Sequence, residues 1–268
     1  MTSDAGSSGS RPFNPEAGLF VGVAGWSISA RYAEAMPPGG SQLERYAKRL
    51  NAVEINSSFY RPHRTETYAK WADATPDGFR FSVKIPKTIT HERRLENCRD
   101  ELRAFADQVR GLGPKLAVVL IQLPPTLAFE QTTVGGLLAD VAAAIPTAVA
   151  IEPRHASWFA AGVDRWLDEH RAARVAADPA IAASGESPGG WSGLRYYRRH
   201  GSPKMYYSDY DADTLRALLT SLRADADAGS ATWCILDNSA SGAALGNALT
   251  LRDLDEAERR ARPSAEAR

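Results

Sequence analysis

The chain has 268 residues, of which 44% are hydrophobic and 24% are charged, a composition typical of a folded globular protein. Its 32 basic and 32 acidic residues give a formal net charge of zero, so overall charge does not favour binding to nucleic acid or to an anionic membrane. The length suits one large domain, and α/β barrels commonly have this size.

Cysteine usage and the absence of long apolar stretches lead us to expect a cytoplasmic protein. Cys98 and Cys234 have no metal-ligand spacing and are typical of reduced packing residues. Residues 1–18 are rich in Ser, Gly and Pro, lack the apolar core of a signal peptide, and predict a disordered tail. No stretch approaches the roughly 18 apolar residues of a membrane span, so we expect no membrane partner.

After this tail, short apolar runs recur along the chain, and their enrichment in β-branched and aromatic side chains predicts β-strands. They occupy residues 19–25, 52–57, 79–84, 116–122, 148–153, 173–178, 194–201 and 232–238. Helical patterns lie between them. One opens with a capping box formed by Ser41 and Glu44, another has Asn97 as its expected cap, and a third begins with an acidic turn at Asp211.

Strands that alternate with helices predict parallel pairing through right-handed crossovers. Eight such runs without a second core predict a single-domain TIM-type (β/α)8 barrel over residues 19–256. Residues 179–193 are too few for a full helix and its turns, so the sixth βα unit is predicted to be eroded. The charged residues 257–268 predict a flexible C-terminal tail.

In a barrel of this kind the active site lies at the carboxyl ends of the strands. The predicted strands have mostly apolar first halves, and polar side chains gather at that end. Because side chains alternate between two faces of a strand, three sets can point into the mouth together: Glu54 with Asn56, Glu152 with Arg154, and Tyr196 with Arg198 and His200.

These positions favour an enzyme, a hydrolase or isomerase, that acts on a small anionic substrate such as a phosphorylated or carboxylated compound. The candidate catalytic residues are Glu54, Glu152 and His200. The candidate substrate-binding residues are Trp26, Asn56, Lys84, Gln122, Arg154, His155, Asp178, Arg198 and Asn238. Burial would raise the pKa of either glutamate to suit general acid or base catalysis. Lys84, Arg154, Arg198 and His200 would form the anion clamp.

Three other functions stay open at this point. No cofactor motif is present and none is expected, but a divalent metal ion would suit a ring formed by Glu54, Glu152, Asp178, His200 and Asp237. Two of these carboxylates, Glu54 and Glu152, would suit glycoside hydrolysis if they lay about 5–10 Å apart. Alternatively, the protein would be a non-catalytic binding or regulatory module that uses the mouth of the barrel to bind its partner. The zero net charge disfavours nucleic acid as that partner.

Most of these residues also have a structural interpretation. A buried glutamate beside an arginine is often a structural ion pair, which applies to Glu54 and Glu152. His155 follows a proline and would suit a helix cap, while Asp178 and Asp237 stand in turn-like sequence.

Several ordered motifs resemble the YecE-like family, a domain of unknown function numbered 72. They are GVAGWS at 22–27, VEINSSFY at 53–60, LIQLPP at 120–125, IEPRHASW at 151–158, RRHG at 198–201 and DNSASGAALGNAL at 237–249. The match runs over most of the chain, from about residue 20 to residue 250. This resemblance implies a TIM-barrel fold and carries no established biochemical activity.

Overall fold

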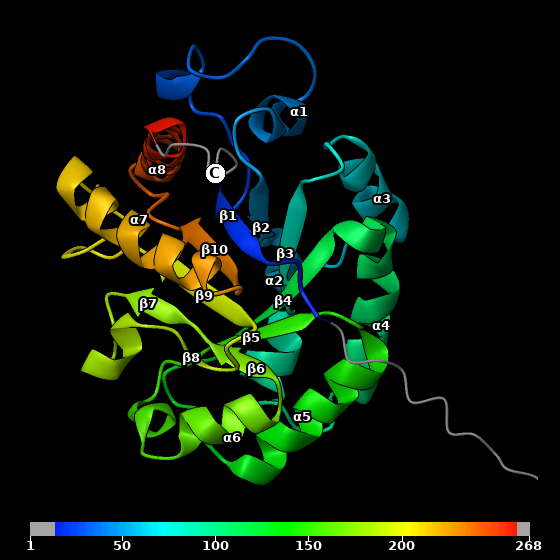
Figure 1. The fold of residues 1–268 in the computed structure, drawn as a ribbon. Coiled ribbons are helices and arrows are strands. Elements are labelled where there is room, and N and C mark those ends of the chain that lie inside the picture. Colours follow the sequence, from blue (N-terminus) through cyan, green and yellow to red (C-terminus); the bar gives the residue numbers. More distant parts are fainter. Residues whose placement is uncertain (1–13, 262–268) are drawn as a thin grey trace, which may run out of the picture.

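The structure is a computed structural model that describes residues 14–261 (Figure 1). Each of the predicted apolar runs contains a strand, and the sixth run is divided at Val175 into two short strands. The strands are β1 (Gly18–Val23), β2 (Ala52–Ile55), β3 (Arg80–Lys84), β4 (Leu116–Gln122), β5 (Ala148–Glu152), β6 (Ala172–Arg174), β7 (Ala176–Asp178), β8 (Gly189–Gly190), β9 (Leu194–Arg199) and β10 (Ala231–Leu236).

The strands form two sheets, with the orders β2-β3-β4-β5-β6-β8 and β1-β10-β9-β7. Pairing is parallel throughout both sheets except between β6 and the two-residue β8. The divided sixth run touches both sheets, because β6 pairs with β5 while β7 pairs with β9. At the opposite junction a parallel bridge joins Ala24 to Glu54, next to the ends of β1 and β2. The predicted parallel α/β fold is therefore confirmed.

Close approach of β1 to β2 depends on two residues. Gly22 lies so near the second strand that a Cβ atom there would stand 2.2 Å from the carbonyl oxygen of Ala52. The hydroxyl of Tyr46 donates to that carbonyl at 2.8 Å and accepts from the backbone N–H of Val23 at 2.9 Å. These contacts fix where Glu54 stands relative to the first strand.

Helices pack around the strands on the outside of the molecule (Figure 1). The α-helices are α1 (Gln42–Ala47), α2 (Ser57–Tyr60), α3 (Thr65–Asp73), α4 (Arg99–Val109), α5 (Gln131–Ala144), α6 (Val163–Glu169), α7 (Ala212–Asp227) and α8 (Ala243–Ala261). Shorter helical turns are η1 (Ala30–Tyr32), η2 (Thr88–Glu92), η3 (Arg110–Lys115), η4 (Ala156–Phe159) and η5 (Ala183–Glu186). Within residues 14–261, none of the helices combines the length and apolar character needed to cross a membrane.

The helix starts agree with the sequence at α1 and α7 and differ at α4. Ser41 and Glu44 form the predicted capping box of α1. Asp211 caps α7, accepting from the N–H of Thr214 at 2.8 Å. The predicted cap Asn97 is wrong, because the structure places it one residue ahead of the cap position, in the left-handed region with φ 51°, and α4 begins after Cys98.

Between β7 and β9 the described chain holds only η5 and β8, so an irregular connection stands where other strands are joined through an α-helix. The predicted tails, residues 1–18 and 257–268, fall mostly outside the described residues. Where they are described, Gly18 opens β1 and α8 continues through Ala261.

Between the strands, the amino-terminal part of the interior is apolar. Trp233 of β10 stacks between Phe20 of β1 and Tyr196 of β9, with ring centroids 5.2 Å and 5.8 Å apart. Small side chains such as Ala148, Ala150 and Ala173 complete this inner core. The charged residues lie past this aromatic layer, toward the carboxyl ends of the strands.

Candidate functional site

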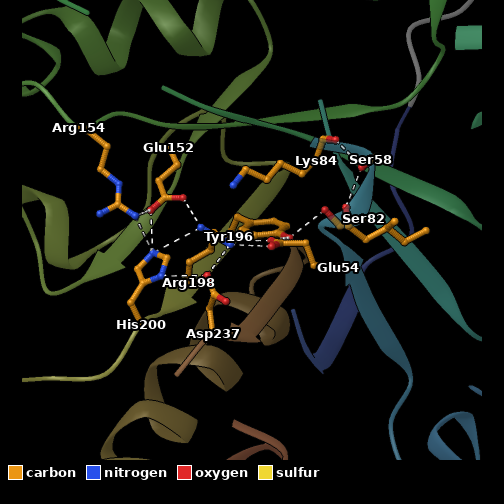
Figure 2. Close-up of polar contacts among 11 residues, drawn as sticks. Glu54, Ser58, Ser82, Lys84, Glu152, Arg154, Tyr196, Arg198, His200 and Asp237 are labelled. Atoms are coloured by element: carbon orange, nitrogen blue, oxygen red, sulfur yellow. Dashed lines mark hydrogen bonds and ion pairs between the residues drawn. The ribbon is translucent and has the colours of Figure 1, made fainter. Parts of the chain in front are cut away.

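Arg198 of β9 is the centre of a buried charge cluster (Figure 2). Its side chain is 1% exposed, and all three of its nitrogens donate to carboxylates. Nε and Nη2 bind Glu54 of β2 at 3.0 Å and 2.7 Å, and Nη1 binds Glu152 of β5 at 2.5 Å. Nη2 also donates to Asp237, which follows β10, at 2.9 Å. Four elements distant in sequence therefore meet at one guanidinium group.

His200, which follows β9, is held between two of these carboxylates. Its Nε2 lies 2.8 Å from Oε1 of Glu152, and its Nδ1 lies 3.1 Å from Oδ2 of Asp237. Burial alone would lower the pKa of His200, but the charge of the Glu152 carboxylate and the hydrogen bonds to Asp237 and Glu152 together outweigh burial, and the pKa is raised. His200 is thus more readily protonated than an ordinary histidine.

Glu152 carries its negative charge despite complete burial. Burial favours the neutral acid, but the opposing charges of Arg198, His200 and Arg154 hold the pKa of Glu152 well below its usual range. The sequence-based expectation that burial raises this pKa is therefore wrong for Glu152, because three cationic neighbours outweigh desolvation. Burial likewise favours the neutral form of Asp237, but the charge of Arg198 and the hydrogen bond and charge of His200 together outweigh burial and hold the pKa of Asp237 below its ordinary value.

Arg154 is bound to the cluster through one nitrogen only. Its Nη2 donates to Glu152 at 2.6 Å and lies 3.0 Å from Nε2 of His200. The side chain is only 9% exposed, yet its buried Nε has no hydrogen-bond partner. Tyr206 contacts His200 edge-on at 5.6 Å and is 39% exposed, so this tyrosine forms part of the outer cover of the imidazole.

On the opposite side, Glu54 binds a second group besides Arg198. The hydroxyl of Tyr196 lies 2.9 Å from Oε2 of Glu54 and 2.9 Å from the hydroxyl of Ser82 on β3. Burial, followed by the charge of Glu54, raises the pKa of Tyr196 well above its ordinary value. Tyr196 thus remains a neutral donor that fixes Glu54 in place.

Lys84, at the end of β3, differs from the other cations of the cluster. It is 7% exposed, and its Nζ makes no hydrogen bond or ion pair with any residue in the described range. The ammonium lies 4.0 Å from the centroid of the Phe59 ring. Burial and the charge of Arg198 lower the pKa of Lys84 to about 8. Figure 2 shows its side chain extending toward the part of the cluster that holds Glu152 and Arg198.

We call these seven residues the Arg198 cluster: Glu54, Lys84, Glu152, Arg154, Arg198, His200 and Asp237. The structure thus brings together all three predicted catalytic residues and the four residues of the predicted anion clamp. The clamp differs from expectation in one respect, because the nitrogens of Arg198 are already occupied by carboxylates. The free donors that remain belong to Arg154 and Lys84.

Three predicted binding residues use their side chains in local structure. His155 caps η4, accepting from the N–H of Ser157 at 3.2 Å. Asp178 accepts from the hydroxyl of Tyr210 at 2.6 Å. Asn238 donates to the backbone oxygen of Ser208 at 2.9 Å and to Asn247 at 2.8 Å. Their position at strand ends resembles that of the cluster residues, but these side chains stabilise loops.

The other three predicted binding residues lie outside the hydrogen-bonded cluster. Trp26 packs edge-on against Trp71 at 5.0 Å, and Gln122 is paired in register with Glu152. Asn56 stands at the start of α2 with a buried Oδ1 that lacks a partner. Sequence reasoning omitted Tyr196 and Tyr206 from the candidate site, although alternation along β9 had placed Tyr196 on the same face as Arg198.

The arrangement does not support the metal alternative. Asp178 is engaged elsewhere, and arginines separate the remaining carboxylates. Within residues 14–261, no group of three or more histidine, cysteine, aspartate or glutamate side chains is placed to hold a metal ion.

Comparison with known sequences places these features in a family. A family model described as "Protein of unknown function DUF72" matches residues 20–268. The UPF0759 protein YecE of Escherichia coli K12 is 29% identical over 167 residues, covering 60% of this chain and 59% of that protein. The UPF0759 protein YunF of Bacillus subtilis 168 is 28% identical over 153 residues, covering 53% and 52%. The chain thus matches less than two thirds of the length of these relatives.

Solved structures show the same fold. A DUF72 family protein from Enterococcus faecalis V583 has a TM-score of 0.74 at 19% identity, covering 88% of this chain and 94% of that one. A sugar phosphate isomerase/epimerase from Parabacteroides distasonis has a TM-score of 0.53 at 12% identity, covering 94% and 97%. At these identities the likeness concerns the fold alone.

Proposed function

This chain belongs to the DUF72 family, whose function is unknown, and we propose that it is an enzyme that acts by acid/base chemistry on a small substrate bearing a phosphate or carboxylate. The observation that carries this proposal is the buried pair of Glu152 and His200 beside Arg154, a guanidinium whose Nε has no partner. A buried cation whose N–H donors lack acceptors costs free energy unless a bound ligand supplies those acceptors.

We also infer that the two sheets together enclose one closed (β/α)8 barrel. Two contacts support closure: the bridge between Ala24 and Glu54, and the divided sixth strand that pairs with β5 through one half and with β9 through the other. In such barrels the chemistry takes place at the carboxyl ends of the strands, where the Arg198 cluster lies.

In this proposal His200 carries the proton. Although burial lowers the pKa of His200, its carboxylate partners raise it above the ordinary value, so the protonated imidazole can serve as the proton donor. Glu152 and Asp237 hold the ring from its two nitrogens, and Arg154 provides donors for the anionic group of the substrate. Proton removal and return at neighbouring carbons is an isomerisation, the class named by the Parabacteroides protein of similar fold.

Access to His200 requires Tyr206 to move. The ring of Tyr206 lies against the imidazole, and its backbone stands in the left-handed region with φ 69°, which is strained for a side chain of this size. A substrate that reaches His200 must therefore displace the Tyr206 ring.

The proposal is tested by anion binding and turnover. We expect inorganic phosphate and a panel of sugar phosphates to bind the wild-type protein in calorimetric titrations, and Arg154→Met to weaken binding at least about tenfold. Arg216→Met, which removes an exposed arginine paired with Asp213 on α7, is the matched control. Equal affinity in the wild type and Arg154→Met would refute the assignment of the anion site.

A further inference from the structure

Lys84 is a buried lysine whose amine has no hydrogen-bond or ion-pair partner among residues 14–261. The other cations of the Arg198 cluster each bind at least one carboxylate, whereas Lys84 Nζ lies over the aromatic ring of Phe59. The end of its strand is fixed from both sides: the backbone N–H of Ile85 donates to Leu120 at 2.9 Å, and Ser58 donates to the carbonyl of Lys84 at 2.7 Å. The backbone at Lys84 is therefore held in place, and no carboxylate among the described residues pairs with the amine.

Lys115 is a half-buried lysine with a structural role, and it provides a comparison for Lys84. Lys115 ends η3, ahead of β4, and its Nζ donates to the carbonyl oxygens of Ala72 and Thr75 at 2.7 Å and 2.6 Å. It also contacts the Thr75 hydroxyl at 3.3 Å. All three donors of Lys115 are used, and Lys84 uses none.

We propose that Lys84 is a nucleophile that forms an imine with the carbonyl carbon of an aldehyde or ketone substrate. This inference deepens the proposed function and rests on it for the anionic group that Arg154 would hold. A buried lysine whose amine packs over an aromatic ring and lies near a guanidinium is in the kind of environment in which lysines act on carbonyl compounds. A purely structural lysine would have a carboxylate or carbonyl acceptor in place of the Phe59 ring.

The chemistry balances without any redox partner. The neutral amine attacks the carbonyl carbon with its lone pair, the carbonyl oxygen takes a proton from an acid of the site, and the nitrogen gives up one of its two protons to a base, which gives a neutral carbinolamine. The hydroxyl group then takes a second proton and leaves as water, while the nitrogen gives up its remaining proton. One carbon–nitrogen double bond replaces the carbon–oxygen double bond, and one water is released.

The charges around Lys84 set the pH at which this amine is available. Burial and Arg198 of β9 disfavour its charged form, while Glu54, Glu152 and Asp237 favour it, and the net pKa is about 8. His91 of η2 is a further titratable neighbour, and burial followed by the charge of Lys84 lowers its pKa. A large neutral fraction therefore exists just above neutral pH, as a carbonyl nucleophile requires.

The test is reductive trapping on the full-length chain. We would incubate the protein with dihydroxyacetone phosphate or with glyoxylate, add sodium borohydride, and locate the added mass by peptide mapping. We expect at least tenfold more labelling at Lys84 than at Lys87, an exposed lysine, and a rise in labelling with pH centred near 8. Lys84→Arg keeps the charge and should remove the label, and Lys115→Met should retain it.

The outcomes separate this inference from the proposed function. Labelling of Lys84 no greater than that of Lys87, or no labelling with either probe, overturns the imine even if Arg154→Met still weakens phosphate binding. If Lys84 is trapped while Arg154→Met binds phosphate as tightly as the wild type does, the imine is supported and the anion site is refuted. If Lys84→Arg fails to fold, labelling of the wild type at Lys84 against Lys115 decides the matter by itself.

Discussion

Two of the buried arginines, Arg198 and Arg223, each bind several carboxylates, and their surroundings differ. Arg223 lies between α7 and α8, where its Nε and Nη2 donate to Asp255 at 3.0 Å and 2.9 Å and its Nη1 binds Glu258. Arg198 lies between the strands and is equally saturated by carboxylates. Both guanidinium groups are therefore satisfied, and neither by itself marks a site of chemistry.

The difference lies in the neighbours of each arginine. Near Arg198, Lys84 has no carboxylate partner among the described residues, and Arg154 has a buried Nε without a hydrogen-bond partner. The Asp255 carboxylate also binds Arg259 at 2.9 Å and Arg252 at 3.5 Å. Arg252, like Arg154, has a buried Nε without a hydrogen-bond partner, so it is the unpaired Lys84 that distinguishes the surroundings of Arg198. Burial of charge is thus a poor indicator of function, and a buried cation without a carboxylate partner is a better one.

Removing the two arginines should have the largest effect on stability. We expect Arg198→Met to lower the free energy of unfolding by about 3–5 kcal/mol, because three buried carboxylates lose their common partner. Arg223→Met should cost less, since Asp255 keeps Arg259. Urea denaturation of both variants measures the difference. A larger loss for Arg223→Met would show that the helix pair, and not the interior cluster, is the dominant buried ion network.

Glu152→Gln is expected to cost about 2 kcal/mol of unfolding free energy, because the amide keeps the shape and part of the hydrogen bonding while three cations lose a charge partner. Once a substrate is found, turnover should fall at least about 100-fold. Glu258→Gln removes a carboxylate from the Arg223 network and should leave turnover unchanged. Full activity in Glu152→Gln would remove this residue from the mechanism.

His200 should make stability depend on pH. Its folded-state pKa lies above the ordinary value, so its stabilising effect is fully present below the ordinary pKa of histidine, about 6.5, and is lost as the pH rises through the folded-state pKa. The stability difference between the wild type and His200→Gln should therefore be larger at pH 5.5 than at pH 9. Chemical denaturation at these two pH values provides the comparison, and a constant difference would contradict the raised pKa.

The two lysines should respond in opposite ways to the same substitution. Lys115→Met breaks three hydrogen bonds and should cost about 1–3 kcal/mol. Lys84→Met removes an unpaired charge from a buried position and should be neutral or slightly stabilising at pH 7. Thermal unfolding of both variants at equal protein concentration distinguishes them. A strong loss of stability in Lys84→Met would mean that the amine has a structural partner.

The sequence could predict the strands and the position of the site because both depend on local patterns. Short apolar runs identify strands, and a period of two places Arg198 and His200 on one face. The pairing between strands depends on register and twist, which no local pattern contains. For that reason the low pKa of Glu152 and the isolation of Lys84 were not predictable.

Position at a strand end, taken alone, also predicted more site residues than the structure brings together. His155 and Asp178 stand at the same ends as Glu152 and Arg198, but their side chains bind Ser157 and Tyr210. Short polar side chains at a strand exit can bind nearby loop groups, and this preference competes with pointing into the mouth. A sequence cannot distinguish the two outcomes when both use the same residue types.

The most direct test of this account is the pKa of the Lys84 amine, measured by NMR on protein labelled with ¹³C at the lysine ε-carbon and assigned with Lys84→Arg. We predict a titration near pH 8 for Lys84, distinct from the ordinary lysine range near 10.4, because burial and Arg198 outweigh the neighbouring carboxylates. A titration of Lys84 in the ordinary range would contradict the central claim, since it would show that the protein gives this amine a partner after all.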